Sequence, residues 1–576
     1  MKKTILTTVS AAALAMSGAA MAQSVSDIDQ NGNANGAVVS QIGANTSDVD
    51  QDGNNNSALV DQTGSGNSST IDQDSFSALA DVTQDGEGNT STITQDDPDN
   101  GSNEGGTTGV AGFDPDATVS QVGNNNTSTV AQTIAANGGF NQTANVAQSG
   151  DNNISTVEQN SDGPGYTGGL GATVVQTGGA TSDILQTGTN GGKNMRASVT
   201  QDSSLSNIIQ TASNTSGFNP SANAIVNQRG GSTSDVFQTL TGDMTGDLTA
   251  NVTQDNGASS LINQNAIGVG SNNADAVVVQ NGASSSTITQ NFNSANGNTY
   301  LATVNQTGDD HTSTILQQTQ GVGNNTLTAD VDQTGSENTS TIRQLGSTSL
   351  ATVIQSGNGN DSKISSRGFG QESLVNQSGD DNQSTIEQGG FGEYASVDQS
   401  GNDNKAFVTQ VSQTNRSDAF VDQSGSNNTA NVTQNGGSLN FADVGQAGTA
   451  STATVLQTAS SWEDSATIDQ RSGADQSTAK ITQRGVGNGS NRSRNEASIT
   501  QDGGMLNSST IEQLGQLNDA ISTQSGSNLL SSIYQNGTSN SVSVSQYGDG
   551  HSSTVSQTGT GNSATVTQGV VAGNPN

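Results

Sequence analysis

The chain of 576 residues contains no cysteine, which excludes disulfide bonds, thiolate metal ligands and redox thiols. Aromatic residues make up only 3% of the sequence and hydrophobic residues only 29%. Globular domains usually contain about 45–50% apolar residues, so the composition alone would indicate a disordered chain. The regular spacing of the residues contradicts that interpretation and indicates a repeat protein.

Positive charge is also scarce, with 15 lysines and arginines against 52 acidic residues and a formal net charge of -37. A nucleic-acid partner requires a basic surface, so we expect no nucleic-acid binding. Long apolar runs are missing as well. No stretch of the chain approaches the roughly 20 apolar residues of a membrane helix, and we therefore expect no membrane insertion.

The first 22 residues have the pattern of a secretory signal peptide. Lys2 and Lys3 form a positive start, residues 5–15 form a short apolar run, and small residues precede a cleavage site between Ala22 and Gln23. We expect the mature chain to begin at Gln23, outside the cytoplasm.

A short phrase repeats every 11 residues between Asn45 and Gln73. Asparagine, a small residue, valine or isoleucine, and glutamine occupy every second position of each copy, which is the period of an extended strand. Gly53 and Gly64 follow two residues after a glutamine and supply turn chemistry. Strand and turn therefore alternate, as in a solenoid. The expected stacking residues of these copies are Asn45, Val49, Gln51, Asn56, Ala58, Val60, Gln62, Asn67, Ser69, Ile71 and Gln73.

We call each strand-forming copy of the phrase an arm. The small residue alternates between serine and alanine from Ser26 to Ala351, so the structural repeat is a serine arm and an alanine arm, together about 22 residues long. The connection from an alanine arm to the next serine arm is short. The connection from a serine arm to the next alanine arm varies in length. We therefore expect a coil with one tight and one variable edge, on which residues 96–116 are the largest insertion. About 44 arms would form about 22 coils and a body on the order of 100 Å long.

Beyond Gln355 the pattern becomes less regular without ending. Ser366 stands in place of a glutamine, alanine arms follow one another from Ala395 to Ala497, and the regular spacing returns from Gln513 to Gln568. The sequence thus predicts an all-β solenoid over residues 23–568, followed by a short tail at residues 569–576.

Inward glutamines such as Gln51, Gln73 and Gln95 predict an amide ladder between coils. One buried valine or isoleucine contributes roughly 1.5–3 kcal/mol, but ordering each backbone residue costs roughly 1–2 kcal/mol, so a single coil is unstable. Stacking adds backbone hydrogen bonds and pairs identical amides with each other. Stability should therefore increase with the number of coils.

Neither end of the repeat shows a capping segment in the sequence. The first arm carries Ser26, Ile28 and Gln30, and the last carries Ala564, Val566 and Gln568. Unpaired terminal strands are templates for another chain, so we expect these residues to be polymerising ends in a homopolymeric cross-β fibre.

The repeated phrase resembles the curlin repeat of bacterial curli amyloid subunits. The resemblance rests on Gln51-x-Gly53-x-x-Asn56-x-Ala58-x-Val60-x-Gln62 and on the segments from Gln121 to Gln132 and Gln423 to Gln434. It implies a secreted subunit of an extracellular functional amyloid in the biofilm matrix. It also implies a nucleator subunit and an outer-membrane secretion channel as partners. Whether the chain is the major subunit or the nucleator stays open.

Acidic residues such as Asp50 and Asp72 precede the glutamine in an outward position, where they are expected to face solvent. Like charges about 4.8 Å apart repel by roughly 1 kcal/mol in water, which predicts slow assembly that salt or mild acid accelerates. The same charges would also keep an exported chain soluble.

No pattern in the sequence indicates catalysis, a metal site or a cofactor. His311 and His551 occupy the position that Asn67 holds in its arm, and we interpret them as substituted ladder residues rather than as metal ligands. Phe76 and Phe292 fall at the variable edge, where they would fill loops or serve lateral contacts.

Two other functional classes fit the repeat less well. A monomeric adhesin or stalk would need a cap, an anchor or a binding domain. An ice-binding solenoid would need an unbroken outward threonine array, which Asp48, Asp50 and Glu158 interrupt.

Overall fold

The structure is a computed structural model. It describes residues 23–96, 115–134, 141–162, 169–189, 194–213, 221–242, 247–268, 272–293, 298–319, 325–411, 415–486 and 492–569. The expected signal peptide up to Ala22, most of the insertion expected at residues 96–116, and all but the first residue of the tail lie outside these ranges. Gln23 is the first described residue.

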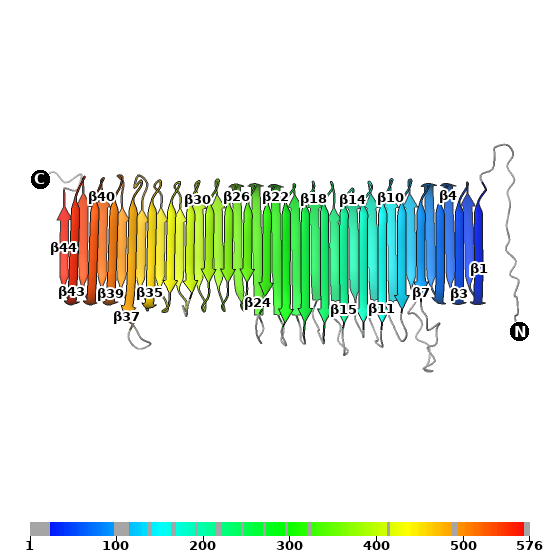
Figure 1. The fold of residues 1–576 in the computed structure, drawn as a ribbon, viewed down its shortest axis with the longest axis horizontal. Helices are drawn as coiled ribbons and strands as arrows, with labels where there is room; N and C mark the ends of the chain where they lie inside the picture. The colour runs from blue at the N-terminus through cyan, green and yellow to red at the C-terminus, as the bar shows by residue number, and fades with distance from the viewer. Residues whose placement is uncertain are drawn as a thin grey trace.

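Two parallel sheets of 22 strands each form one straight stack that runs from the N-terminal to the C-terminal coil (Figure 1). The odd-numbered strands form sheet A and the even-numbered strands form sheet B, and no helix occurs in the described ranges. The prediction of an all-β solenoid of about 22 two-armed coils is confirmed.

Sheet A consists of the serine arms and of the alanine arms that replace them late in the chain. Its strands are β1 (Val25–Asn33), β3 (Thr46–Asn54), β5 (Ser68–Phe76), β7 (Thr90–Asp96), β9 (Thr127–Ile134), β11 (Ile154–Asp162), β13 (Thr181–Thr189), β15 (Leu205–Ser213), β17 (Thr233–Thr241), β19 (Ser259–Ile267), β21 (Ser285–Asn293), β23 (Thr312–Gln318), β25 (Thr339–Gln344), β27 (Asp361–Ser366), β29 (Gln383–Gln388), β31 (Lys405–Val411), β33 (Thr429–Asn435), β35 (Thr452–Ser460), β37 (Thr478–Val486), β39 (Ser508–Gln516), β41 (Leu530–Thr538) and β43 (Ser552–Thr560).

Sheet B consists mainly of the alanine arms. Its strands are β2 (Gly36–Ile42), β4 (Ser57–Ser65), β6 (Leu79–Glu87), β8 (Asp116–Val122), β10 (Asn141–Ser149), β12 (Gly169–Thr177), β14 (Met195–Asp202), β16 (Ser221–Gln228), β18 (Asp247–Asp255), β20 (Asn272–Asn281), β22 (Asn298–Asp309), β24 (Asn325–Ser336), β26 (Ser349–Asn358), β28 (Glu372–Ser378), β30 (Tyr394–Ser400), β32 (Asp418–Gln423), β34 (Phe441–Gln446), β36 (Ser465–Gln470), β38 (Glu496–Gln501), β40 (Asp519–Ser525), β42 (Ser541–Tyr547) and β44 (Ser563–Gln568).

The register places each residue of the phrase against its copy in the next coil. In β3 and β5, Val49 pairs with Ile71 and Gln51 pairs with Gln73. The long connection before β8 does not shift this register, because Gln84 of β6 still pairs with Gln121. Insertions on the variable edge therefore leave the stacking intact.

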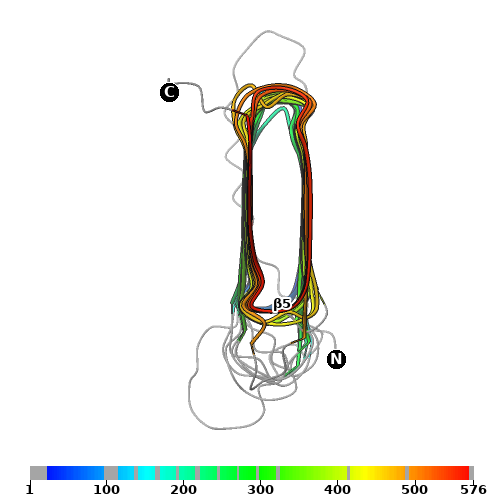
Figure 2. The ribbon, with the colours of Figure 1, turned by 90° about the vertical axis from the view of Figure 1, so that its left-hand side faces the viewer.

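The core lies between the two sheets, which face each other as flat walls when the stack is viewed end on (Figure 2). Alternate residues of each strand point inward, so that Val49 of sheet A and Val60 of sheet B are both fully buried. Most coils contribute one such pair, although Ser522 takes the place of the valine in β40, and the buried column continues through nearly the whole stack.

Many of the turns after the glutamines depend on stacked glycines. Gly64 has φ +110°, and a Cβ atom at this position would lie 1.8 Å from the carbonyl oxygen of Gly86 in the next coil. Glycine is therefore required both for the positive φ and for the close approach of the two coils.

A second apolar cluster lies inside the variable edge of the middle coils. Its members stand two residues after the glutamine of a sheet A strand or two residues before the alanine of a sheet B strand. They are Leu170, Met195, Ala212, Ala222, Leu240, Leu248, Ala266, Ala274, Phe292, Tyr300 and Leu327.

The interpretation of Phe292 as a loop or lateral-contact residue is therefore wrong. Its ring is 1% exposed and stacks on Tyr300 with ring centroids 4.0 Å apart, and burial raises the pKa of Tyr300 to about 12. The strands of the middle coils extend one inward position beyond the phrase, which carries Phe292 into the core. Phe76, at the end of β5, is 40% exposed.

Candidate assembly site: the amide ladders and the two ends

Inward glutamines of successive coils form a continuous chain of hydrogen bonds. In sheet A, Nε2 of Gln51 donates to Oε1 of Gln73 at 2.7 Å, and Gln73 donates in the same way to Gln95 at 2.8 Å. All three side chains are fully buried. The donor always belongs to the coil nearer the N-terminus, so the ladder has a direction.

The second N–H of many of these amides is also used. Nε2 of Gln73 donates to the carbonyl oxygen of Ser57, and Nε2 of Gln84 donates to that of Ser68, each in the preceding arm on the opposite sheet. The glutamine column thus ties each coil to the next and also ties the two arms of a coil together. A buried amide that uses both donors and its acceptor carries no desolvation penalty from a missing partner.

The sheet B ladder runs without interruption from Gln41 to Gln568. The sheet A ladder stops at Gln344 and resumes at Gln388, because the intervening β27 carries Ser366 in the glutamine position. The hydroxyl of Ser373 from sheet B donates to Oε1 of Gln388 at this gap.

Asparagines form a second ladder in the turns. Oδ1 of Asn45 accepts a hydrogen bond from the backbone N–H of Asn67, whose own Nδ2 donates to the carbonyl oxygens of Thr63 and Gly86. Asn56 makes the same kinds of bond at the other edge, where its Oδ1 accepts from the N–H of Ala78. These turns are thus fixed to the turns of the next coil.

His311 replaces asparagine in one of these turns. It is 1% exposed, its Nδ1 accepts from the backbone N–H of Asn338, and its Nε2 lies 3.1 Å from the carbonyl oxygen of Thr307. The imidazole therefore supplies the acceptor and the donor that an asparagine amide supplies. His551 stands in the corresponding position of the last coil and is partly exposed.

The small inward residues differ between the two sheets. Ala58 and Ala80 pack in the sheet B column, whereas Ser69 occupies the sheet A column. The Ser69 hydroxyl is buried and has no hydrogen-bond partner among the described residues. In later coils of sheet A, Ala406 and Ala430 occupy the position of this serine.

The two terminal coils present inward residues of the same types. Ser26, Ile28 and Gln30 lie on β1, which pairs within the described ranges only with β3. At the other end Ala564, Val566 and Gln568 lie on β44, which pairs only with β42 there. Ile28 and Val566 are only partly buried, unlike their counterparts inside the stack.

Acidic residues form exposed columns on the first coils of sheet A. Asp29, Asp50 and Asp72 are in register on β1, β3 and β5. Partial burial raises the pKa of Asp50, and the neighbouring charges of Asp72 and Asp29 raise it further. Partial burial and then the charges of Asp74 and Asp96 raise the pKa of Asp72. Other outward acidic residues that the structure leaves exposed are Asp61, Glu158, Glu387, Asp398 and Asp422.

Sequence reasoning missed two buried carboxyl groups in the turns that precede sheet B strands. Glu393 is 1% exposed and its Oε2 accepts a hydrogen bond from Nε2 of Gln371. Asp464 is fully buried between Asn440 and Asn495. Both stand two residues before an alanine, in the position of Asn56, and this spacing is the signal that could have identified them.

No group of three or more metal-ligating side chains gathers within the described ranges. The same part of the chain contains no helix long and apolar enough to cross a membrane.

These ladders define a β-solenoid repeat protein whose stability and contacts come from stacking equivalent coils. A family model for the Curlin associated repeat matches the chain at four places, residues 44–74, 323–357, 379–411 and 537–569. The chain is a curlin-repeat protein, as the resemblance of its phrase predicts. The repeat family and the fold point to a structural protein rather than an enzyme, and the family suggests an extracellular or surface location. A comparison with curated proteins gave no match.

Proposed function

We propose that the mature chain is a secreted subunit that polymerises end to end into an extracellular curli-like functional amyloid fibre. In the biofilm matrix such fibres would serve adhesion and cell aggregation. The observation that carries this proposal is the match between the terminal coils. Ser26, Ile28 and Gln30 of β1 already pair with a serine, a valine and a glutamine in β3, and β43 carries the same three residue types in the same order.

A second copy that placed its first coil on the last coil of another would continue both ladders. In sheet A, Val555 and Gln557 would meet Ile28 and Gln30. In sheet B, Ala564, Val566 and Gln568 would meet the alanine, valine and glutamine of β2. Buried apolar surface and main-chain hydrogen bonds would both be gained, as in cross-β assemblies.

The direction of the ladder favours contact between unlike ends. Gln568 donates to the carbonyl oxygen of Ser552 and has a second N–H, while Oε1 of Gln41 accepts no hydrogen bond from the described residues. An amide donor at the C-terminal end would therefore meet an amide acceptor at the N-terminal end. Two like ends would bring two donors or two acceptors together.

The charges of the ends favour the same arrangement. Asp27 and Asp29 of β1 would lie next to Thr554 and Ser556 of β43, which are uncharged. Hydroxyl groups can donate to the two carboxylates across this junction. Contact between two N-terminal ends would instead bring four carboxylates together.

We further propose that the chain reaches the cell surface through an outer-membrane channel and that a nucleator subunit starts fibre growth. Both partners are those that the resemblance of the repeat to curli subunits implies. Their test is secretion and fibre formation by cells that lack either one.

The proposal is tested with residues 23–576 released from denaturant without a seed, by thioflavin fluorescence followed by fibre diffraction. We expect fibres with reflections near about 4.8 Å and about 10 Å. A soluble β-rich monomer that never seeds would reject the fibre subunit and favour a monomeric solenoid adhesin or stalk.

End-blocked variants test the head-to-tail arrangement. Val39→Lys and Val566→Lys place a charge on the inward face of the first and last coil, respectively, where docking would bury it unpaired. Each variant alone should stay monomeric, and an equimolar mixture should give dimers. Ser40→Lys and Thr565→Lys add the same charge on the outward face and should still form fibres. Dimers of a single blocked variant would indicate contact between like ends.

A further inference from the structure

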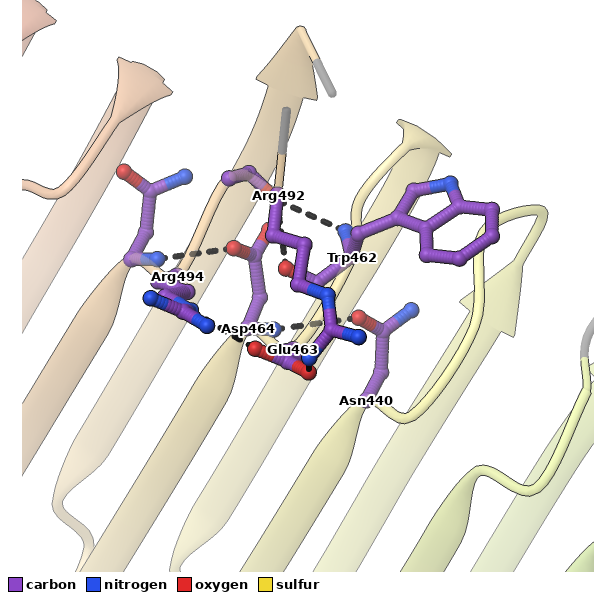
Figure 3. A network of polar contacts seen from close by, with 8 residues as sticks. Asn440, Trp462, Glu463, Asp464, Arg492 and Arg494 are labelled. Carbon is purple, nitrogen blue, oxygen red and sulfur yellow. Dashed lines mark hydrogen bonds and ion pairs between the residues drawn. The ribbon is translucent and has the colours of Figure 1, made fainter. Parts of the chain in front are cut away.

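Asp464 interrupts a column of asparagines with a buried carboxyl group. It precedes β36 in the turn position that Asn440 occupies one coil earlier and Asn495 one coil later (Figure 3). The residue is fully buried. Its coil lies next to the last coils of the stack, which run from β37 to β44.

Only part of the Asp464 carboxyl group is hydrogen-bonded. The backbone N–H of Asp464 donates to Oδ1 of Asn440 at 3.2 Å, and Oδ1 of Asp464 accepts from the N–H of Asn495 at 2.8 Å. These two bonds reproduce the asparagine pattern. Oδ2 of Asp464, in contrast, has no hydrogen-bond partner among the described residues.

Asparagines of the same column place a donor where Asp464 has Oδ2. Nδ2 of Asn518 donates to Oδ1 of Asn495 at 3.1 Å and to the carbonyl oxygen of Gly537 at 3.2 Å. Nδ2 of Asn540 donates in the same way to Oδ1 of Asn518. As a carboxylate, Asp464 has no donor at this position, and its Oδ2 is left without a hydrogen-bond partner among the described residues. A protonated carboxyl group restores the missing donor.

The charged side chains near Asp464 form ion pairs with one another. Arg492 and Arg494 of the following coil both form ion pairs with Glu463, and Figure 3 draws these pairs beside Asp464. The preceding coil contributes Leu439 and Asn440, which carry no charge. Within the described ranges, no ion pair reaches Asp464 itself.

We propose that Asp464 is a protonation switch in the joint between the coil of β35 and β36 and the coil of β37 and β38. As a neutral acid it completes the asparagine column and holds the C-terminal coils to the rest of the stack. As a carboxylate it leaves a buried charge and loosens this joint. Proton concentration thereby controls how firmly the C-terminal end is held in place.

The environment of the carboxyl group supports this assignment. Burial raises the pKa of Asp464, and nearby donors of Ser493, Asn495 and Ser461 oppose part of the rise. Because the folded state holds the proton more tightly than the unfolded state, the joint gains stability as the pH falls and loses it as the pH rises.

The test is hydrogen exchange of the full mature chain, residues 23–576, measured in peptides that cover residues 461–501 between about pH 4 and about pH 8. We expect protection factors of the wild type to fall with rising pH, by up to about tenfold per unit over the titration range. Asp464→Asn supplies the amide of the neighbouring coils and should remove this dependence while keeping high protection.

Glu496→Gln is the matched control, because it removes one exposed carboxylate from the first residue of β38. It should retain the wild-type pH profile. The proposal is overturned if Asp464→Asn keeps the wild-type profile, or if it lowers protection at every pH, since the carboxylate would then be the stabilising form.

Discussion

Gln51 and Gln73, which lie one coil apart, are joined by a 2.7 Å hydrogen bond from Nε2 to Oε1, and both side chains are fully buried. The bond links residues that are 22 positions apart in the chain, so neither amide can be satisfied by local structure. A ladder of this kind makes each coil depend on its neighbours. Mutations should therefore act on the joints between coils, and their effects should be largest where a partner amide is left unpaired.

Ser366→Gln should repair the interruption of the sheet A ladder. The new amide would lie between Gln344 and Gln388 and offer each of them a partner. We expect the free energy of unfolding to rise by about 1 kcal/mol for the restored bonds, measured by urea denaturation of the monomer. Ser366→Leu fills the same space without an amide and is the control. An equal gain in both variants would assign the effect to packing alone.

Ser69→Ala should stabilise the N-terminal coils. The buried hydroxyl has no partner, and the chain itself uses Ala406 in this column. Removing an unsatisfied buried group is expected to add about 1 kcal/mol to the free energy of unfolding. Ser155→Ala is the comparison, because the Ser155 hydroxyl donates to the hydroxyl of Ser128 at 3.3 Å. This variant should gain less free energy of unfolding than Ser69→Ala. A loss of stability in Ser69→Ala would mean that its hydroxyl is bonded in solution.

Gly64→Ala should separate two coils at the turn. The new Cβ atom would lie 1.8 Å from the carbonyl oxygen of Gly86, and φ of +110° is unfavourable for alanine. We expect a loss of about 3 kcal/mol in the free energy of unfolding. Gly36→Ala is the control, since a Cβ at Gly36 meets no atom within 4 Å. Comparable urea midpoints for the two variants would contradict the requirement for glycine at this turn.

Mild acid should stabilise the first coils. The pKa of Asp50 and of Asp72 is raised in the folded chain by burial and by neighbouring carboxylates. The folded state thus binds more protons than the unfolded state, and stability increases as the pH falls from neutral toward the ordinary aspartate value of 3.8. Thermal unfolding at low salt measures this dependence.

Asp72→Asn should reduce the increase in stability that acid causes. It should also stabilise the chain at neutral pH by about 0.5 kcal/mol, a typical cost of a like-charge pair. Asp235→Asn is the matched control, because Asn207 and Leu261, its partners in register, are uncharged. A pH dependence of thermal stability that persists unchanged in Asp72→Asn would argue against repulsion in this column.

The sequence by itself determined the arms, their pairing and their inward face. Alternation along the phrase of Ser69, Ile71 and Gln73 is sufficient for this, because a strand has a period of two and its neighbour in the stack repeats the same residues. The two-sheet solenoid and the curlin-repeat family follow from that regularity.

Only the tertiary structure decided what lies beyond the phrase. Phe292 and Tyr300 are inside because the middle strands continue by one inward position, and the length of a strand is set by the coils stacked on it. Asp464 and Glu393 are buried because the register between coils overrides the preference of a carboxylate for water. A short sequence pattern assigns faces within an arm, but the depth of burial at an edge depends on neighbours more than 20 residues away, such as Asn440 for Asp464.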